Sequence, residues 1–130
     1  MKIIDGKDAV LGRLAVYAAK EALKGEEIIV VNCNEIIISG NKKDIKEKLE
    51  EKRTKIGSGQ RGPKHSRLNY MIVKRVIRGM LPNARRNGRG REAYKKIKCY
   101  NEIPREYESS EKIKFNEKKI KFIKMRDIVK

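Results

Sequence analysis

Apolar residues along most of the chain fall into short continuous runs separated by helical stripes. Lys2 to Ile4 is a candidate strand, and Ile28 to Val31 is a continuous β-branched run, which is typical of a strand covered on both faces. Residues 8–24 predict a helix that Asp8 caps and that Gly25 ends with a positive φ angle. Its apolar stripe consists of Leu11, Leu14, Ala15, Ala18 and Ala22. Because most of these side chains are small, the helix can lie close on a sheet.

The same kind of pattern continues toward the C-terminus. The later elements are expected as a strand at Ile36 to Ile38, a helix over residues 41–56 capped by Asn41, a helix at Arg67 to Arg78 capped by Ser66, a short helix at Glu92 to Lys96 and a strand at Ile97 to Tyr100. After Pro104 the charges are mixed, and a strand near Lys119 to Ile123 is the better interpretation. The order of strand, helix, strand, strand and helix is an α/β pattern.

Length and composition favour one domain with an aliphatic core. The chain has 130 residues, including 17 Ile but only two Phe and no Trp. Cys33 and Cys99 lie far apart, and no apolar run of signal-peptide type occurs, so we expect an intracellular protein. No segment approaches the roughly 20 apolar residues that a membrane span requires, and we expect no membrane partner.

The stretch from Lys52 to Arg91 holds most of the excess positive charge. It contains 13 Lys or Arg and no Asp or Glu, whereas the whole chain carries 34 basic and 17 acidic residues. It also contains nine of the 12 Arg. Arginine suits bidentate contact with phosphate and stacking on bases, whereas a merely solvated surface usually mixes both signs of charge. The expected partner is therefore a polyanion that carries bases.

Within this stretch the spacing of the cations predicts a helix with two different faces. Arg67, Met71, Lys74 and Arg78 share one face, with Arg75 beside them, and Ile72, Val73, Val76 and Ile77 lie on the opposite side. Cations one or two turns apart are separated by roughly 5 to 11 Å along the axis, which suits successive phosphates. Residues 85–91 then combine arginines with glycines, which lets the backbone come close to a phosphate.

The sequence offers little for a catalytic, metal or cofactor site. Gly57 to Gly62 satisfies G-x-G-x-x-G, but it lacks the strand before and the helix after that a dinucleotide site requires, so we interpret it as a cationic loop. His65, the single histidine, has no identifiable orienting partner. Neither cysteine has a C-x-x-C companion, and no Gly-Lys-Ser/Thr phosphate loop occurs. We therefore expect no enzyme activity, metal, cofactor or small-molecule substrate.

Three blocks of sequence occur in the order of a known family. The first block is Ile4-Asp5-Gly6 through Leu11-Gly12-Arg13-Leu14-Ala15, with Gly25 after it. The second is Val30-Val31-Asn32-Cys33-Asn34-Glu35 with Ile38-Ser39-Gly40. The third is Arg78-Gly79-Met80-Leu81-Pro82, followed by Ala93, Lys98 and Tyr100. Over about residues 3–104 the chain resembles the large-subunit ribosomal protein thirteen family, and Gly62-Pro63 with Ser66-Arg67 is similar to its archaeal and eukaryotic branch. The resemblance implies a small, largely parallel four-stranded sheet with helices on both faces, a three-layer α/β/α fold with basic loops and a short C-terminal extension.

The resemblance also implies a function. The protein would be a structural constituent of the large ribosomal subunit in the cytoplasm. It would bind large-subunit rRNA, lie beside other large-subunit proteins and support assembly of the subunit. By resemblance, the RNA contacts are Arg61, Lys64, Arg67, Lys74, Arg75, Arg78, Arg85, Arg86, Arg89 and Arg91. We expect residues 1–104 to form one RNA-binding domain that includes the basic segment 52–91, and residues 105–130 to form an extension packed on it.

Two other classes of protein stay open at this point. A sequence-indifferent DNA-binding or chromatin-type protein would make much the same phosphate contacts, so charge alone does not separate it from an RNA-binding protein. An enzyme acting on nucleic acid would need a cofactor pocket or paired carboxylates inside the basic region, and the sequence offers neither. Preference for folded RNA over duplex DNA distinguishes the first two classes.

Overall fold

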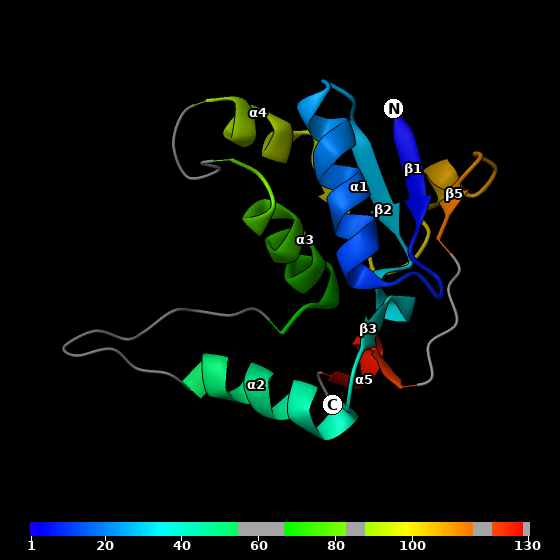
Figure 1. Cartoon of the computed structure of the whole chain (residues 1–130). Coiled ribbons are helices and arrows are strands. Elements are labelled where there is room, and N and C mark those ends of the chain that lie inside the picture. Colours follow the sequence, from blue (N-terminus) through cyan, green and yellow to red (C-terminus); the bar gives the residue numbers. More distant parts are fainter. Residues whose placement is uncertain (55–66, 83–87, 116–120, 129–130) are drawn as a thin grey trace.

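A four-stranded parallel sheet forms the centre of the protein (Figure 1). The computed structural model describes residues 1–54, 67–82, 88–115 and 121–128. The strands lie in the order β4-β2-β1-β5, with bounds β1 Lys2–Asp5, β2 Ile28–Val31, β4 Ile97–Cys99 and β5 Ile113–Lys114. Each neighbouring pair is parallel. The prediction of a small α/β fold built on a largely parallel four-stranded sheet is confirmed.

Strand β2 lies between β1 and β4, and all four of its side chains are buried. Alternate residues of a strand point to opposite faces of the sheet. Ile28 and Val30 join the larger core cluster, whereas Ile29 and Val31 join a smaller cluster with Ile3. The sheet is therefore covered on both faces, as the continuous apolar run predicted.

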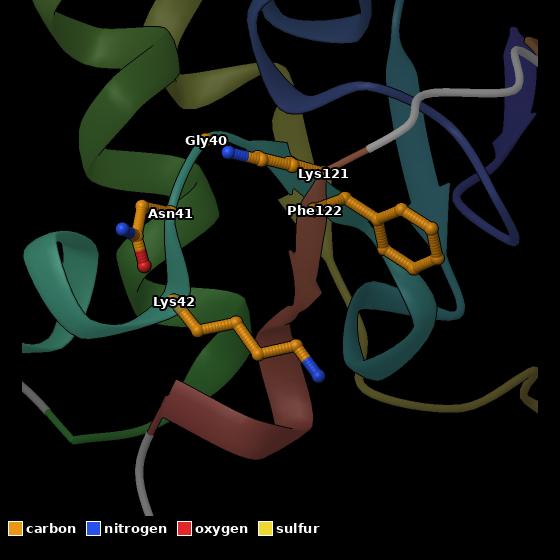
Figure 2. Close-up of a pocket in the computed structure, with 5 residues that line it drawn as sticks. All are labelled: Gly40, Asn41, Lys42, Lys121 and Phe122. Atoms are coloured by element: carbon orange, nitrogen blue, oxygen red, sulfur yellow. The ribbon is translucent and has the colours of Figure 1, made fainter.

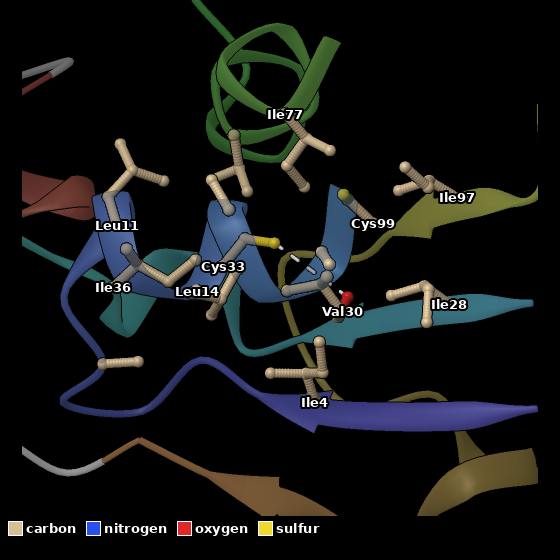
Figure 3. Packing of buried hydrophobic residues seen from close by; sticks show 14 of the residues in the cluster. Ile4, Leu11, Leu14, Ile28, Val30, Cys33, Ile36, Ile77, Ile97 and Cys99 are labelled. Atoms are coloured by element: carbon tan, nitrogen blue, oxygen red, sulfur yellow. Dashed lines mark hydrogen bonds between the residues drawn. The ribbon is translucent and has the colours of Figure 1, made fainter. Parts of the chain in front are cut away.

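Three α-helices cover the face that carries the larger cluster. They are α1 (Leu11–Leu23), α3 (Asn69–Gly79) and α4 (Arg89–Lys95). Figure 3 shows Ile4, Ile28 and Val30 on the strands, with Leu14 of α1 and Ile77 of α3 packed in the same cluster. Every residue of the predicted α1 stripe is buried, and Gly25 follows the helix with a φ of +99°. The predictions of the buried stripe and of the positive φ angle at Gly25 are confirmed.

The opposite face has a thinner cover than we expected. Tyr100, Ile103 and Tyr107 pack there on the smaller cluster, and the only regular element described in that segment is the single-turn 3₁₀ helix η2 (Arg105–Tyr107). The smaller cluster presents three buried aliphatic side chains, so a short segment returning from β4 is enough to cover it. Among the described residues, the second helical layer is therefore a 3₁₀ turn instead of α-helices.

The strand after β2 leaves the main sheet. Asn32 adopts the left-handed conformation with a φ of 57° and begins the 3₁₀ turn η1 (Cys33–Glu35). The next strand, β3 (Ile37–Ser39), pairs antiparallel with β6 (Phe122–Lys124), whose position agrees with the strand expected near the C-terminus. In the chain, helix α2 (Lys42–Thr54) follows β3, and helix α5 (Met125–Ile128) follows β6. Asn41 caps α2 as predicted, because its side-chain oxygen accepts a hydrogen bond from the Lys43 N–H at 3.2 Å.

The prediction that Asp8 caps α1 is wrong. Asp8 lies in the left-handed region with a φ of 57°, and Val10 directly precedes the helix without a side-chain cap. The Ala9 carbonyl accepts the Ile37 N–H at 2.8 Å, and Val10 forms a parallel bridge to Ile37. Because residues 9 and 10 pair with β3, the helix begins only at Leu11.

The two cysteines are buried side by side in the larger core cluster and are both free (Figure 3). The Cys33 thiol donates a long hydrogen bond, 4.0 Å, to the Val30 carbonyl. The neighbouring Cys99 side chain, together with burial, raises the pKa of the Cys33 thiol. Cys33 is therefore a protonated thiol that fills space in the apolar core.

Glu21 ties the end of α1 to the start of β1. Its carboxylate forms ion pairs with the ammonium groups of Lys2 and Lys24, although Glu21 itself is 8% exposed. The hydrogen bond from Lys2, followed by that from Lys24, lowers the pKa of Glu21 below its usual value of 4.5. A carboxyl whose pKa is lowered by folding stabilises the folded protein above its unfolded pKa, and this contribution is lost as the pH falls.

We expect Glu21→Gln to lower the free energy of unfolding at neutral pH. The difference from wild type should shrink as the pH falls from about 4.5 through the folded pKa of Glu21, because the wild-type carboxylate is then protonated and loses its attraction to Lys2 and Lys24. Urea unfolding at a series of pH values measures this difference. The matched control is Glu27→Gln at an exposed position in the following loop. A constant difference across the whole pH range would contradict the prediction.

Candidate nucleic-acid interface

Helix α3 presents one apolar and one cationic side, as its sequence predicted. Val73 and Ile77 are completely buried, and Ile72 and Val76 pack at the edge of the same core cluster. On the other side, Met71 is exposed, and Lys74, Arg75 and Arg78 are half-buried. Long basic side chains can cover apolar surface with their stems while the charged ends reach solvent. The helix is therefore held by its aliphatic side and presents its cations outward.

Three asparagines fix the start of α3. The Asn101 side-chain oxygen accepts a hydrogen bond from the Tyr70 N–H at 3.0 Å, and the Asn69 amide donates to the side-chain oxygen of Asn34. Asn34 belongs to η1, and Asn101 follows β4, so one free backbone N–H of the helix and the Asn69 side chain are tied to segments that follow two strands. No local pattern indicated these partners, because they are distant in sequence. The predicted cap, Ser66, lies outside the described residues.

The end of α3 is joined closely to α4. Leu81 is buried, and Gly90 in the first turn of α4 lies so near Pro82 that a Cβ atom on Gly90 would overlap the Pro82 carbonyl oxygen. Lys74 of α3 lies over the Tyr94 ring of α4, with 4.9 Å between the ammonium nitrogen and the ring centroid. This cation–π contact stabilises the pair of helices by about 0.5–1 kcal/mol. Two contacts, Gly90 with Pro82 and Lys74 with Tyr94, thus connect α4 with α3 and the residues that follow it.

Six of the ten predicted contact residues lie on or beside these helices. We call them the α3–α4 cationic surface, which consists of Arg67, Lys74, Arg75, Arg78, Arg89 and Arg91. Arg67, Arg89 and Arg91 are exposed. The other four, Arg61, Lys64, Arg85 and Arg86, lie outside the described residues, as do His65 and most of the glycine-containing loop. No acidic residue occurs in the sequence from Lys52 to Arg91, and Glu92 follows directly in the first turn of α4.

Other kinds of site find no support in the part of the chain that the structure describes. There, no group of three or more His, Cys, Asp or Glu side chains is placed to hold a metal ion. The one buried aspartate, Asp5, is a turn residue, because its oxygen accepts hydrogen bonds from the Lys7 N–H at 3.0 Å and from the Asn32 amide at 2.9 Å. None of the described helices is long and apolar enough to cross a membrane.

A pocket of about 440 Å³ lies apart from this surface, between the start of α2 and β6 (Figure 2). It is lined by Gly40, Asn41, Lys42, Lys121 and Phe122. The two lysines extend in opposite directions in Figure 2, so the pocket does not bring their charges together. Asn41 already caps the helix start beside it. The pocket therefore has less to offer an anion than the α3–α4 cationic surface.

The fold is that of a small α/β protein, and its helices α3 and α4 carry a group of basic side chains. Comparison with known proteins gives the particular family. The family described as Ribosomal protein L13 matches residues 1–106, and the chain belongs to this family.

Its relatives are archaeal proteins that carry the name Large ribosomal subunit protein uL13. The protein of Methanocaldococcus jannaschii is 39% identical over 133 aligned residues, covering 100% of this chain and 96% of the relative. The protein of Thermoplasma volcanium is 42% identical over 113 residues, with 87% and 80% covered. That of Methanococcus maripaludis is 48% identical over 107 residues, with 80% and 77% covered. The resemblance seen in the sequence, including its archaeal type, is confirmed.

We expect Gly90→Ala and Gly12→Ala to have opposite effects on stability, although both glycines lie in the first turn of a helix. The new methyl group on Gly90 would meet the Pro82 backbone, so α4 must shift and the free energy of unfolding should fall by about 1–3 kcal/mol. Apart from the backbone of α1 itself, no atom of the described residues lies within 4 Å of a Cβ atom on Gly12, so alanine there should stabilise the protein by about 0.5–1 kcal/mol.

Urea unfolding followed by circular dichroism measures both effects on matched preparations, with the wild-type chain as reference. The close approach of α4 to Pro82 would be contradicted if Gly90→Ala were as stable as wild type.

Proposed function

We propose that this chain is a structural component of the large ribosomal subunit that binds large-subunit rRNA through the α3–α4 cationic surface. The observation that carries the proposal is that surface itself, in which the outward sides of two helices present cations and no carboxylate between Arg67 and Arg91. Family membership supports the ribosomal context, because the relatives are named large ribosomal subunit proteins. The role is structural and not catalytic, and it places the protein on cytoplasmic ribosomes beside other large-subunit proteins.

The composition of the surface suits RNA. RNA helices are recognised mainly by shape and by contacts to phosphates and 2′-hydroxyl groups, which basic side chains on a rigid scaffold supply. Lys74 and Arg78 are one turn apart on α3, a spacing of about 6 Å along the helix axis. Arg89 and Arg91 extend the row onto α4. Arg61, Lys64, Arg85 and Arg86 belong to the same proposed contact set, because they lie in the segments that connect or precede these helices.

The second candidate is a sequence-indifferent DNA-binding protein, which the same surface would also serve. The two candidate functions differ in which nucleic acids should compete for binding to the surface. Binding to duplex DNA would depend on phosphate charge alone, whereas a ribosomal protein should prefer its own folded RNA.

We expect a complex with transcribed archaeal large-subunit rRNA to survive an excess of unrelated RNA and of duplex DNA at moderate salt. A filter-binding competition with labelled rRNA measures the fraction that remains bound. The unlabelled rRNA itself is the control competitor and should displace the label. Equal displacement by duplex DNA would reject the ribosomal proposal in favour of the DNA-binding candidate.

We expect Arg78→Ala to weaken binding to this rRNA and to reduce the salt dependence by one contact. Each neutralised phosphate releases condensed counterions, so the slope of log K against log salt concentration should become less steep by about 0.7–0.9. Alanine is a strong helix former, so α3 should persist, and circular dichroism checks this.

The matched control is Lys98→Ala. Lys98 lies on β4 between the buried residues Ile97 and Cys99, so its side chain points to the opposite face of the sheet. This control should keep the wild-type slope. An unchanged slope in Arg78→Ala would mean that Arg78 does not contact RNA.

A further inference from the structure

The C-terminal segment, residues 122–128, consists of β6 and α5 and lies beside β3 (Figure 1). Three of its side chains, Ile123, Met125 and Ile128, are buried in the larger core cluster. The Met125 N–H also donates a hydrogen bond to the Ile36 carbonyl at 2.8 Å. Burial of three large apolar side chains holds a short segment firmly on the rest of the protein. The C-terminal segment is therefore part of the folded core, although it lies outside the main sheet.

Glu35 of η1 binds the C-terminal segment with both of its carboxylate oxygens. Oε2 accepts a hydrogen bond from the Lys124 ammonium at 2.9 Å, and Oε1 accepts one from the Arg126 guanidinium at 2.8 Å. The side chains of Glu35 and Lys124 are each 25% exposed, so water competes only in part for this bond. The position of η1 is thus tied to residues that lie 89 and 91 positions later in the sequence.

The residue before Glu35 holds the start of α3. The Asn34 side-chain oxygen accepts a hydrogen bond from the amide of Asn69, the first residue of the helix. Among the described residues, the Asn69 side-chain oxygen is buried without a hydrogen-bond partner, so the bond to Asn34 is the one polar contact of this side chain there. The Asn34 N–H also donates to the carbonyl of Asn101, whose side chain binds the Tyr70 N–H. Both attachments of the helix start therefore depend on where Asn34 lies.

Asn34 and Glu35 are successive residues of one tight turn. The Glu35 N–H donates to the Asn32 carbonyl at 3.0 Å, and the Ile36 N–H donates to the Cys33 carbonyl at 3.4 Å. These bonds, between residues three apart, close the 3₁₀ turn and leave it little internal freedom. The turn contacts both α3 and α5. A shift of Glu35 is therefore passed on to Asn34.

We propose that η1 couples the C-terminal segment to the start of α3. Glu35 is then a positioning residue, which acts on α3 through Asn34. The coupling goes beyond the proposed function and does not require it, because both contacts act on one structural element, η1. Only its consequence for RNA affinity rests on the proposed function, since α3 carries cations of the α3–α4 cationic surface.

The first test is a double-mutant cycle between Arg126→Gln and Asn69→Ala, measured by urea unfolding. The two side chains bind different residues of η1 and are not bonded to one another. Coupling predicts that the double variant loses less than the product of the two single effects on the unfolding equilibrium constant. The shortfall should be about threefold or more, beyond the roughly twofold scatter of independent sites. The control pair is Glu21→Gln with Asn69→Ala, which should be multiplicative. Multiplicative effects for Arg126→Gln with Asn69→Ala would overturn the inference.

The second test is amide hydrogen exchange in Glu35→Gln, without any nucleic acid. The Tyr70 and Ile72 N–H groups belong to the first turn of α3. Their exchange, relative to that of the amides of β2, should become about two- to fivefold faster, the factor that corresponds to loss of a partly exposed ion pair. Glu21→Gln lowers the stability at a different place, so this variant should keep the wild-type ratio. An unchanged ratio in Glu35→Gln would reject the coupling.

The third test measures affinity for transcribed archaeal large-subunit rRNA, where charge and position predict opposite results. Glu35→Gln removes a negative charge, so electrostatics alone would make binding to a polyanion tighter. Coupling predicts binding that is weaker by about two- to fivefold, with the wild-type salt slope because no phosphate contact is lost. The matched control, Glu27→Gln, removes an exposed acid outside η1 and should bind at least as tightly as wild type. Binding of Glu35→Gln as tight as that of Glu27→Gln would count against a positioning role.

These measurements separate the inference from the proposed function. The double-mutant cycle and the exchange experiment contain no RNA, so their failure would reject the coupling and leave the α3–α4 cationic surface in place. Coupling in both experiments, together with equal displacement of the wild-type rRNA complex by duplex DNA, would support the inference and reject the proposed function.

Discussion

Burial of β2 on both faces is the constraint on which the rest of the structure depends. Each completely buried Ile or Val is worth roughly 1.5–3 kcal/mol relative to exposure, so this one strand contributes an amount comparable with the whole stability of a small domain. To cover Ile28 and Val30, the chain needs α1 and α3 above one face. To cover Ile29 and Val31, it needs the segment that returns from β4 beneath the other. The helices on one face of the sheet and the segment after β4 on the other face are therefore both required by the apolar run in β2.

Parallel strands bring their carboxyl ends to one edge, and the polar residues at that edge direct the chain out of the sheet. Asp5 closes its own turn and holds the Asn32 amide, while Asn32 turns the chain into η1. Asn34 and Asn101 then bind the first turn of α3. The helix that carries most of the described cations is therefore oriented by groups at the edge of the sheet. This arrangement links the buried β2 to the outward direction of Lys74, Arg75 and Arg78.

Features that depend on local periodicity could be predicted from the sequence, and features that depend on distant partners could not. The stripe of α1 and the two sides of α3 follow from a repeat of 3.6 residues, and β2 follows from a β-branched run. The fourth strand of the main sheet, β5, has two residues and no pattern of its own. Pairing of β3 with β6 joins segments more than 80 residues apart, which no window of sequence contains.

The same distinction applies to the candidate interface. The cations of α3 are visible as a helical face, but the asparagines that cap the helix are single polar residues far away in the chain. The contact between Gly90 and Pro82 is equally invisible, because a glycine among arginines has an adequate explanation in backbone freedom alone.

Acidic and basic residues serve different purposes in this protein. Two acidic residues form ion pairs that connect separate elements. Glu21 joins α1 to β1, and Glu35 of η1 binds Lys124 at 2.9 Å and Arg126 at 2.8 Å. Partly exposed pairs of this kind contribute little stability, about 0–1 kcal/mol each, so their main effect is to fix where the C-terminal segment lies. The bases of α3 and of α4 up to Arg91 belong instead to a stretch of sequence, Lys52 to Arg91, that contains no acidic residue. A stretch in which one sign of charge is concentrated attracts the opposite sign, and this is the physical basis on which we propose a polyanion as its partner.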